Sequence, residues 1–153
     1  MLYVEKTTPE DCFRLAPNLK QLDKFEVALW GFDPLQALLL PFRYKTLSKH
    51  TYTVFDKSDN IVAIFGVTPV TNKPTSGRIW LLSSDLLEKN FFYFLKVNKK
   101  WLRYLEEDYN HLSNYITEEH ETSIKWLKWQ GFSFAEKPML VKNVKVLYFY
   151  KRL

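Results

Sequence analysis

The sequence has 153 residues, of which 46% are hydrophobic and 25% are charged. This length and composition suit one globular domain over residues 1–153, and they exclude a disordered tail or a coiled coil as the main architecture. The net charge of +5 permits an acidic partner without requiring one, because a basic surface raises the local concentration of anions.

Cysteine content and apolar runs limit the expected location. Cys12 is the single cysteine, so no disulfide can form within the chain and a reducing compartment is expected. The N-terminus does not show the basic and then apolar start of a signal peptide. No apolar run approaches the roughly 20 residues that a membrane-spanning helix needs. We therefore expect no membrane span and no secretion by a signal peptide.

The first forty residues predict one strand followed by helices. Residues 2–5 alternate between apolar and polar side chains, as a strand does. Thr8 and the proline after it supply an N-cap and a first-turn residue for a helix. Helical sequence continues over 18–30, and a glycine interrupts it at Gly31. An Asp-Pro pair then starts a further helix over 33–40.

The middle of the chain predicts strands. Residues 51–55 and 61–67 are rich in branched and aromatic side chains, and turn-forming residues at 56–60 separate them, so a hairpin is expected. Residues 71–76 have the composition of a loop, and residues 78–82 follow as a third strand.

The second half predicts two helices that alternate with strands. Residues 83–85 offer caps for a helix that extends to about residue 109, and Asp85 with Glu88 fits a capping box. The remaining elements are expected to be a strand at 111–116, a helix at about 120–130, a strand at 132–135 and a final strand at 145–152.

This order of elements resembles that of the acyl-CoA N-acetyltransferase superfamily, the GNAT fold. The likeness is sharpest where Ser-Ile-Lys-Trp-Leu-Lys-Trp-Gln-Gly-Phe runs from Ser123 to Phe132, because the late helix of that family commonly ends in Gly-Phe at the start of the next strand. The resemblance implies an α+β fold in layers, with a mixed, mostly antiparallel central sheet flanked by helices. Gly131 is expected to have positive φ at the helix end.

A subgroup of this superfamily is more similar still. Three stretches resemble, in order, the small GNAT-like proteins of podovirus-type phages, which are internal virion or virion-assembly proteins. The stretches are 79–85, 100–114 and 120–134, and the resemblance covers residues 78–136. It implies a protein that acts by contacts with phage or host proteins, in the host cytoplasm, the virion or both.

The same resemblance bears on catalysis. An enzyme of this fold presents backbone N–H groups to the CoA pyrophosphate from a glycine-containing loop. The equivalent residues, 83–92, contain no glycine, and Asp85 and Glu88 add negative charge. The tyrosine that often acts as general acid would fall at Leu127. We therefore expect a non-catalytic protein without a cofactor; an active acetyl-CoA-dependent N-acetyltransferase that modifies a host or phage amine is the alternative.

Candidate site residues follow from that alternative. If acyl-CoA binds, the residues expected to contact it are Leu82, Ser83, Ser84 and His120. His120 falls where the family often has an asparagine, and its simplest interpretation is a polar residue near a helix start. The acidic residues at 118, 119 and 121 could supply a base, but the helix dipole favours acids there in any case. No catalytic residue is assigned.

Other arrangements of reactive residues are weaker. The sequence has three histidines, widely separated, and no metal-ligand spacing, so no metal site is expected. Ser83 or Ser84 with His120 could form a nucleophile and base only by coincidence of folding.

Aromatic and basic residues admit two interpretations each. Trp126 and Trp129 share a helical arc with apolar neighbours, which predicts packing on the sheet. The alternating aromatic residues at 148–152 fit burial of one strand face better than a nucleic-acid stacking platform, although they resemble both. The basic residues at 96–103 are expected on a solvated helix face, and nucleic-acid binding is the less favoured alternative.

Overall fold

The protein is described by a computed structural model that covers residues 1–43 and 49–153. Its centre is one eight-stranded sheet with the order β1-β2-β3-β4-β5-β8-β6, and β7 also pairs with β8. The strands are β1 (Leu2–Lys6), β2 (His50–Asp56), β3 (Ile61–Val70), β4 (Lys73–Ser83), β5 (His111–Thr117), β6 (Ser133–Phe134), β7 (Met139–Val141) and β8 (Val144–Arg152). The β4–β5 pair is parallel and the other described pairs are antiparallel. The predicted mixed, mostly antiparallel sheet is confirmed.

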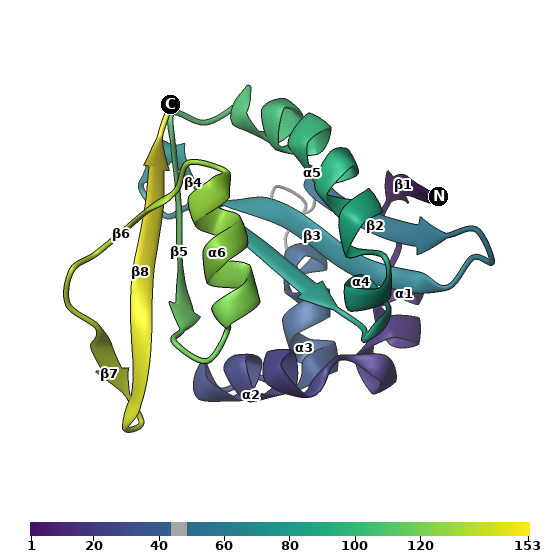
Figure 1. The fold of residues 1–153 in the computed structure, drawn as a ribbon, viewed down its shortest axis with the longest axis horizontal. Helices are drawn as coiled ribbons and strands as arrows, with labels where there is room; N and C mark the ends of the chain where they lie inside the picture. The colour runs from purple at the N-terminus through teal and green to yellow at the C-terminus, as the bar shows by residue number, and fades with distance from the viewer. Residues whose placement is uncertain (44–48) are drawn as a thin grey trace.

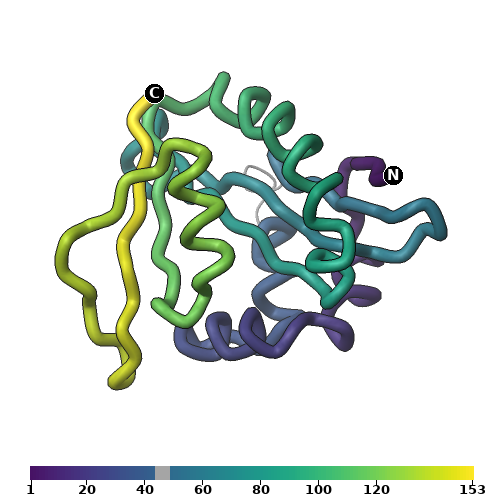
Figure 2. The backbone as a smooth tube through the Cα atoms, in the orientation of Figure 1, coloured from purple at the N-terminus to yellow at the C-terminus, as the bar shows by residue number. Residues whose placement is uncertain are grey.

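Helices flank this sheet (Figure 1). They are α1 (Pro9–Leu15), α2 (Gln21–Leu29), α3 (Pro34–Leu39), α4 (Leu86–Lys89), α5 (Phe91–Glu106) and α6 (Glu121–Trp129), with short 3-10 turns at Ala16–Asn18 and Leu40–Phe42. The backbone trace in Figure 2 shows α2 lying across the end of the sheet where β5 finishes. Layers of helix on both sides of a sheet are the arrangement that the order of elements predicts.

Two apolar clusters hold the layers together. On one face, Phe94 and Leu102 of α5 and Leu127 of α6 pack with side chains of β2 and β3. On the opposite face, Leu15 of α1 and Leu38 of α3 pack with another set of sheet residues. The strands between these clusters are apolar on both faces, which explains the continuous burial of residues 61–67.

Several local predictions are confirmed. Thr8 caps α1 in a capping box with Asp11, and Asp33 caps α3 in the same way. Gly31 and Gly131 have φ of 85° and 97°, conformations that an L side chain rarely adopts. Gly31 therefore ends the α2 segment, and Gly131 turns the chain out of α6, as the sequence indicates.

The predicted loop at 71–76 is wrong in part. β3 continues to Val70 and β4 already begins at Lys73, so only two residues form the turn. Asn72 has φ of 64°, and asparagine tolerates this left-handed conformation better than most residues. A tight hairpin therefore replaces the longer loop.

The helix predicted from 83–85 to about residue 109 is divided. Asn90, with φ of −114°, separates the short α4 from α5. Asp85 makes no capping hydrogen bond, because its own backbone is already helical and the hydroxyl of Ser84 accepts the N–H of Leu86 instead. The capping-box prediction at Asp85 is therefore wrong.

The C-terminal region contains a strand that the sequence did not predict. β7 pairs with β8 through a turn in which Lys142 and Asn143 have φ of 48° and 63°. Cys12 is a buried free cysteine, and burial raises the pKa of its thiol to about 11. Within 1–43 and 49–153, no helix has the length and apolar character to span a membrane.

Candidate functional site

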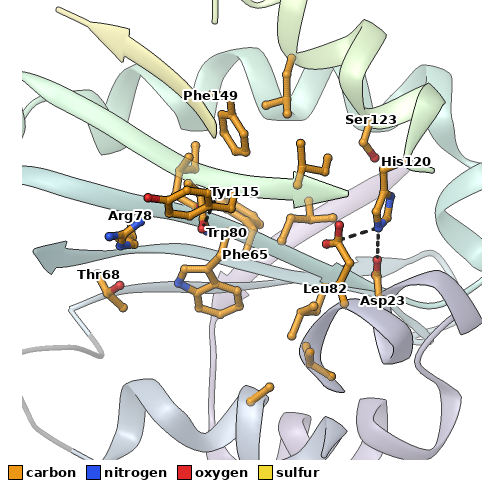
Figure 3. A pocket seen from close by; sticks show the side chains of 18 of the residues that line it. Asp23, Phe65, Thr68, Arg78, Trp80, Leu82, Tyr115, His120, Ser123 and Phe149 are labelled. Carbon is orange, nitrogen blue, oxygen red and sulfur yellow. Dashed lines mark hydrogen bonds and ion pairs between the residues drawn. The ribbon is translucent and has the colours of Figure 1, made fainter. Parts of the chain in front are cut away.

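A cavity opens where β4 and β5 separate. The two strands pair over three positions, from Ser76 opposite His111 to Arg78 opposite Ser113. Beyond Arg78 they diverge, and the wedge between them leads into a cavity of about 570 Å³ (Figure 3). A parallel pair that parts in this way leaves backbone groups of both strands without a ladder partner.

Most of the cavity wall is apolar. Its lining includes Phe65, Trp80, Leu82, Ile116, Leu127 and Phe149. Polar groups lie at its two ends: Arg78 lies where the strands still pair, and Asp23 and His120 lie at the opposite end in Figure 3. A largely apolar pocket with a few polar groups is the usual form of a ligand or docking site.

Two carboxylates of α2 span the wide end of the wedge. Oδ2 of Asp23 accepts the backbone N–H of Ser83 at the end of β4, at 2.8 Å. Oε1 of Glu26 accepts the backbone N–H of Thr117 at the end of β5, at 2.6 Å. The helix therefore bonds to both separated strands and holds the wedge at a fixed width.

Asn114 satisfies two more backbone groups in the same wedge. Its Nδ2 donates to the carbonyl of Ile79 on β4 at 2.7 Å, across the gap. Its Oδ1 accepts the N–H of Tyr115 at 2.8 Å. Side chains of the protein itself thus satisfy backbone groups that the missing ladder would leave free.

His120 lies between the two α2 carboxylates. Its Nε2 is 3.4 Å from Oδ1 of Asp23 and 3.4 Å from Oε2 of Glu26, and the side chain is only 6% exposed. The interpretation of His120 as a simple polar residue near a helix start is therefore incomplete. The sequence signal that could have found its partners is the spacing of Asp23 and Glu26, three apart on one helix face.

Burial changes the acidity of this cluster. Loss of solvation raises the pKa of Glu26, and His120 and the Thr117 N–H oppose that rise. The acidic residues at 118 and 119, which the sequence offered as bases, are exposed and do not line the cavity. The acids that line it come from α2.

Ser83, Ser84 and His120 do not form a nucleophile and base. The hydroxyl of Ser83 donates to Oδ2 of Asp23 at 3.2 Å, and the hydroxyl of Ser84 donates to the carbonyl of Ile61 at 2.9 Å. Among the described residues neither hydroxyl contacts the imidazole, so the histidine cannot take a proton from either.

The turn after β4 uses its backbone N–H groups internally. The Ser84 N–H donates to the carbonyl of Val62, the Leu86 N–H to the hydroxyl of Ser84, and the Leu87 N–H to the carbonyl of Ser84. With Ser83 bonded to Asp23, four N–H groups of this turn already have acceptors. An anion bound to these N–H groups would have to displace their present acceptors.

The other predicted site positions are divided between cavity and core. Leu82 and His120 line the cavity, whereas Ser83 and Ser84 are buried outside it. Leu127 also lines the cavity and is 5% exposed. Phe91 and Phe92 do not line it, and Phe92 is 68% exposed, so neither fills the wedge.

The two tryptophans of α6 differ. Trp126 packs against Phe94 with ring centroids 5.6 Å apart, and its buried indole N–H has no described partner. Trp129 is 62% exposed, so the prediction that both rings pack on the sheet is wrong for Trp129. The helix turns Trp129 away from the sheet in its last turn, next to the exposed Lys128.

Solved structures share this fold over nearly the whole chain. An acetyltransferase of the GNAT family from Streptococcus pneumoniae aligns with a TM-score of 0.63 and 14% identity, covering 100% of this chain and 99% of that one. Ard1 from Thermoplasma volcanium aligns with a TM-score of 0.71 and 11% identity, covering 99% and 97%. This chain has the GNAT acetyltransferase fold. At these identities the GNAT likeness shows the fold alone.

A third neighbour has its cofactor bound. The spermidine N-acetyltransferase from Vibrio cholerae, in complex with CoA and spermine, aligns with a TM-score of 0.69 and 12% identity, covering 99% of this chain and 95% of that one.

No family model and no curated protein matches the sequence. Within the described residues of this GNAT fold, no group of three His, Cys, Asp or Glu side chains could hold a metal ion.

Proposed function

We propose that this chain is a non-catalytic protein of the GNAT fold that acts by contacts with other proteins. The observation that carries the proposal is the Asp23 carboxylate, which is 4% exposed and already accepts the N–H of Ser83 where β4 ends. A buried carboxylate bonded to that N–H repels a phosphate and removes a donor that would bind it.

The turn that follows supports the same conclusion. Four of its N–H groups have internal acceptors, and the chain has no glycine between Gly77 and Gly131 that would let a ligand approach the backbone closely. Leu127 supplies no proton where the fold's enzymes often have a tyrosine. These features favour a protein that uses neither a CoA cofactor nor a general acid at Leu127.

The setting follows from the sequence resemblance over residues 78–136. We propose that the protein is an internal component or assembly factor of a podovirus-type phage particle. Mass spectrometry of purified particles tests this setting: the chain should be present at a fixed number of copies, and its absence from both particles and assembly intermediates would contradict the proposal.

An acetyltransferase that modifies a host or phage amine is the second candidate, and the open cavity favours it. Phe91 and Phe92 leave the wedge between β4 and β5 free, so apolar space for part of a cofactor exists. CoA is present in the Vibrio cholerae neighbour, which makes acetyl-CoA the cofactor to test.

Isothermal titration with acetyl-CoA decides between the two. We expect no saturable heat with the native chain, because the anion would have to displace Asp23. Micromolar binding at a stoichiometry near one would overturn the non-catalytic proposal. Asp23→Asn keeps the size of the side chain and removes its charge, so binding gained only by this variant would identify the carboxylate as the obstacle.

A further inference from the structure

The far half of the sheet carries a row of aromatic and basic side chains on one face. β5 and β8 pair Tyr115 with Tyr148 and Ser113 with Tyr150, so these side chains point to the same side. Arg78, opposite Ser113 on β4, joins them. We call Arg78, Tyr115, Tyr148, Tyr150 and Arg152 the tyrosine strip.

The strip lies on the face opposite α5 and α6. Leu112, Ile116 and Phe149 point toward those helices and are buried in their cluster. The tyrosines of the strip alternate with them along the strands and are only half-buried. Helices α1 and α3 pack on the other half of the sheet, and α2 reaches the strip through Trp30, whose ring lies 5.7 Å from Tyr115.

Four side chains of the strip, from Arg78 to Tyr150, contact one another in sequence. The Arg78 guanidinium lies 5.4 Å from the Tyr115 ring, and the Tyr115 and Tyr148 rings are 5.2 Å apart. Tyr148 stacks on Tyr150 at 5.7 Å with an interplanar angle of 22°. These contacts restrict the rings before any partner binds, which lowers the entropy lost on binding.

The hydroxyl and guanidinium groups of the strip form no hydrogen bond or ion pair within the described part of the chain. Among the described residues, the three tyrosine hydroxyls accept and donate no hydrogen bond, and neither Arg78 nor Arg152 forms an ion pair. The positions paired across this face carry no acidic side chain. Glu26 lies near one end, but its carboxylate bonds to Thr117 and faces His120. The strip therefore presents hydroxyl and guanidinium donors with uncompensated positive charge.

We propose that the tyrosine strip is the docking surface for an extended, acidic segment of a partner protein. This proposal rests on the proposed function, since it names the kind of partner that a contact protein would bind. Guanidinium groups bind carboxylates in a bidentate manner, and tyrosine and arginine are the side chains that most often anchor interfaces.

Two other occupants fit less well. A second copy of this chain would bring Arg78 and Arg152 against the same residues of its neighbour, in a molecule of net charge +5. Single-stranded nucleic acid needs free ring faces for its bases, whereas Tyr150 is stacked between Tyr148 and His111, whose ring lies at 6.2 Å and 20°. The strip offers ring edges and hydroxyls, which suit carboxylates and peptide carbonyls.

Fluorescence anisotropy of the full chain with labelled probes tests this assignment. The probes are a short peptide of alternating glutamate and leucine, the same peptide with lysine for glutamate, and an oligothymidylate. We expect saturable binding of the acidic peptide alone. Arg78→Glu and Arg152→Glu should each weaken it by about 10-fold, and Tyr148→Phe, which keeps the ring, by about 3-fold.

Lys99→Glu on α5 is the matched control, because it makes the same charge change at an exposed position away from the strip. It should change the affinity by less than about 2-fold. Equal loss from Lys99→Glu and Arg152→Glu, tighter binding of the oligothymidylate, or no binding of the acidic peptide would each overturn the proposal. If the protein binds acetyl-CoA and still binds the acidic peptide, the proposed non-catalytic function is wrong, but the assignment of the tyrosine strip as a docking surface stands.

Discussion

The two halves of the sheet, on either side of the wedge, are built differently. In the first half, β3 is buried from Ile61 to Val67, because α5 covers one face and α1 and α3 cover the other. In the second half, Phe149 of β8 is buried in the cluster with α5 and α6, whereas its neighbours Tyr148 and Tyr150 on the other face are half-buried. A strand covered on both faces reads as one apolar run, and a strand covered on one face alternates.

This difference suggests that the first half of the sheet mainly supplies stability and the second half mainly supplies contacts with partners. The first half contributes most of the packed core, and the second half leaves Tyr148 and Tyr150 half-exposed on one face. Three paired positions and the carboxylates of α2 join the halves across the wedge. Changes in the first half should therefore unfold the protein, and changes in the second half should alter what it binds.

The largest effect is expected at Gly66 in β3. A Cβ at this position would lie 2.1 Å from the backbone carbonyl oxygen of His50, so Gly66→Ala must force two strands apart. We expect a loss of more than about 3 kcal/mol in the free energy of unfolding, measured by chemical denaturation.

Gly131→Ala in the second half is the comparison for that change. A Cβ there meets only the side chain of Lys151 at 3.7 Å, but φ is 97°, so the cost is conformational and about 1 kcal/mol. If both glycine variants lose the same stability, the contrast between the halves fails.

Truncation of core side chains should show the next largest difference. Ile64 is fully buried in β3, and Ile64→Ala should cost about 3 kcal/mol through lost burial and the cavity that remains. Tyr148→Ala in β8 should cost less than about 1 kcal/mol, because the open face can rehydrate. Urea titrations of both variants measure the two values, and a larger loss at Tyr148 would contradict the description of its face as open.

Removing the link between the halves should have an intermediate effect. Asp23→Ala leaves the buried N–H and hydroxyl of Ser83 without their acceptor, so about 2 kcal/mol of stability should be lost. Hydrogen exchange should rise at Ser83 in particular. Glu119→Ala, in the exposed turn before α6, is the control and should be neutral; protection of Ser83 that survives in Asp23→Ala would contradict this role.

The smallest effect concerns the pH dependence of stability. Burial raises the pKa of Glu26 above its usual 4.5, so the native state binds this proton more tightly than the unfolded state does. The contribution of Glu26 to stability is therefore greatest at or below pH 4.5 and declines as pH rises through the folded pKa.

Glu26→Gln tests that sign, since glutamine keeps an acceptor for the Thr117 N–H and does not titrate. The stability of the variant relative to the native protein should increase from pH 4.5 upward, as followed by thermal unfolding at a series of pH values. A relative stability that falls over this interval would show that the carboxylate gains more from His120 than it loses by burial.

Much of the fold could be predicted because its signals are local. Thr8 and Asp33 start helices, and Gly31 and Gly131 end helical segments, as their side chains or backbone freedom require. The predicted elements were wrong where the backbone conformation of a single residue decided the local geometry. Asn72 tightened the predicted loop into a hairpin turn, and Asn90 divided the predicted helix.

The candidate site was only partly predictable. Leu82 and His120, which the resemblance offers as contacts for acyl-CoA if it binds, both line the cavity, and their contact with a cofactor stays a prediction. Asp23 and Glu26 were missed, because a charged residue on an amphipathic helix usually faces water. Nothing near them in sequence indicates that they bond to β4 and β5, which lie far along the chain.

By itself, the sequence determined the order of the elements, the likeness to the GNAT fold and the absence of glycine from residues 83–92, since these depend on local chemistry and motif. Only the tertiary structure decided that the N–H of Ser83 is taken by Asp23 and that His120 lies between two acids. It also decided that Tyr148 and Tyr150 face an open side of the sheet. These features depend on contacts between distant segments, and strand pairing rather than sequence proximity brings those segments together.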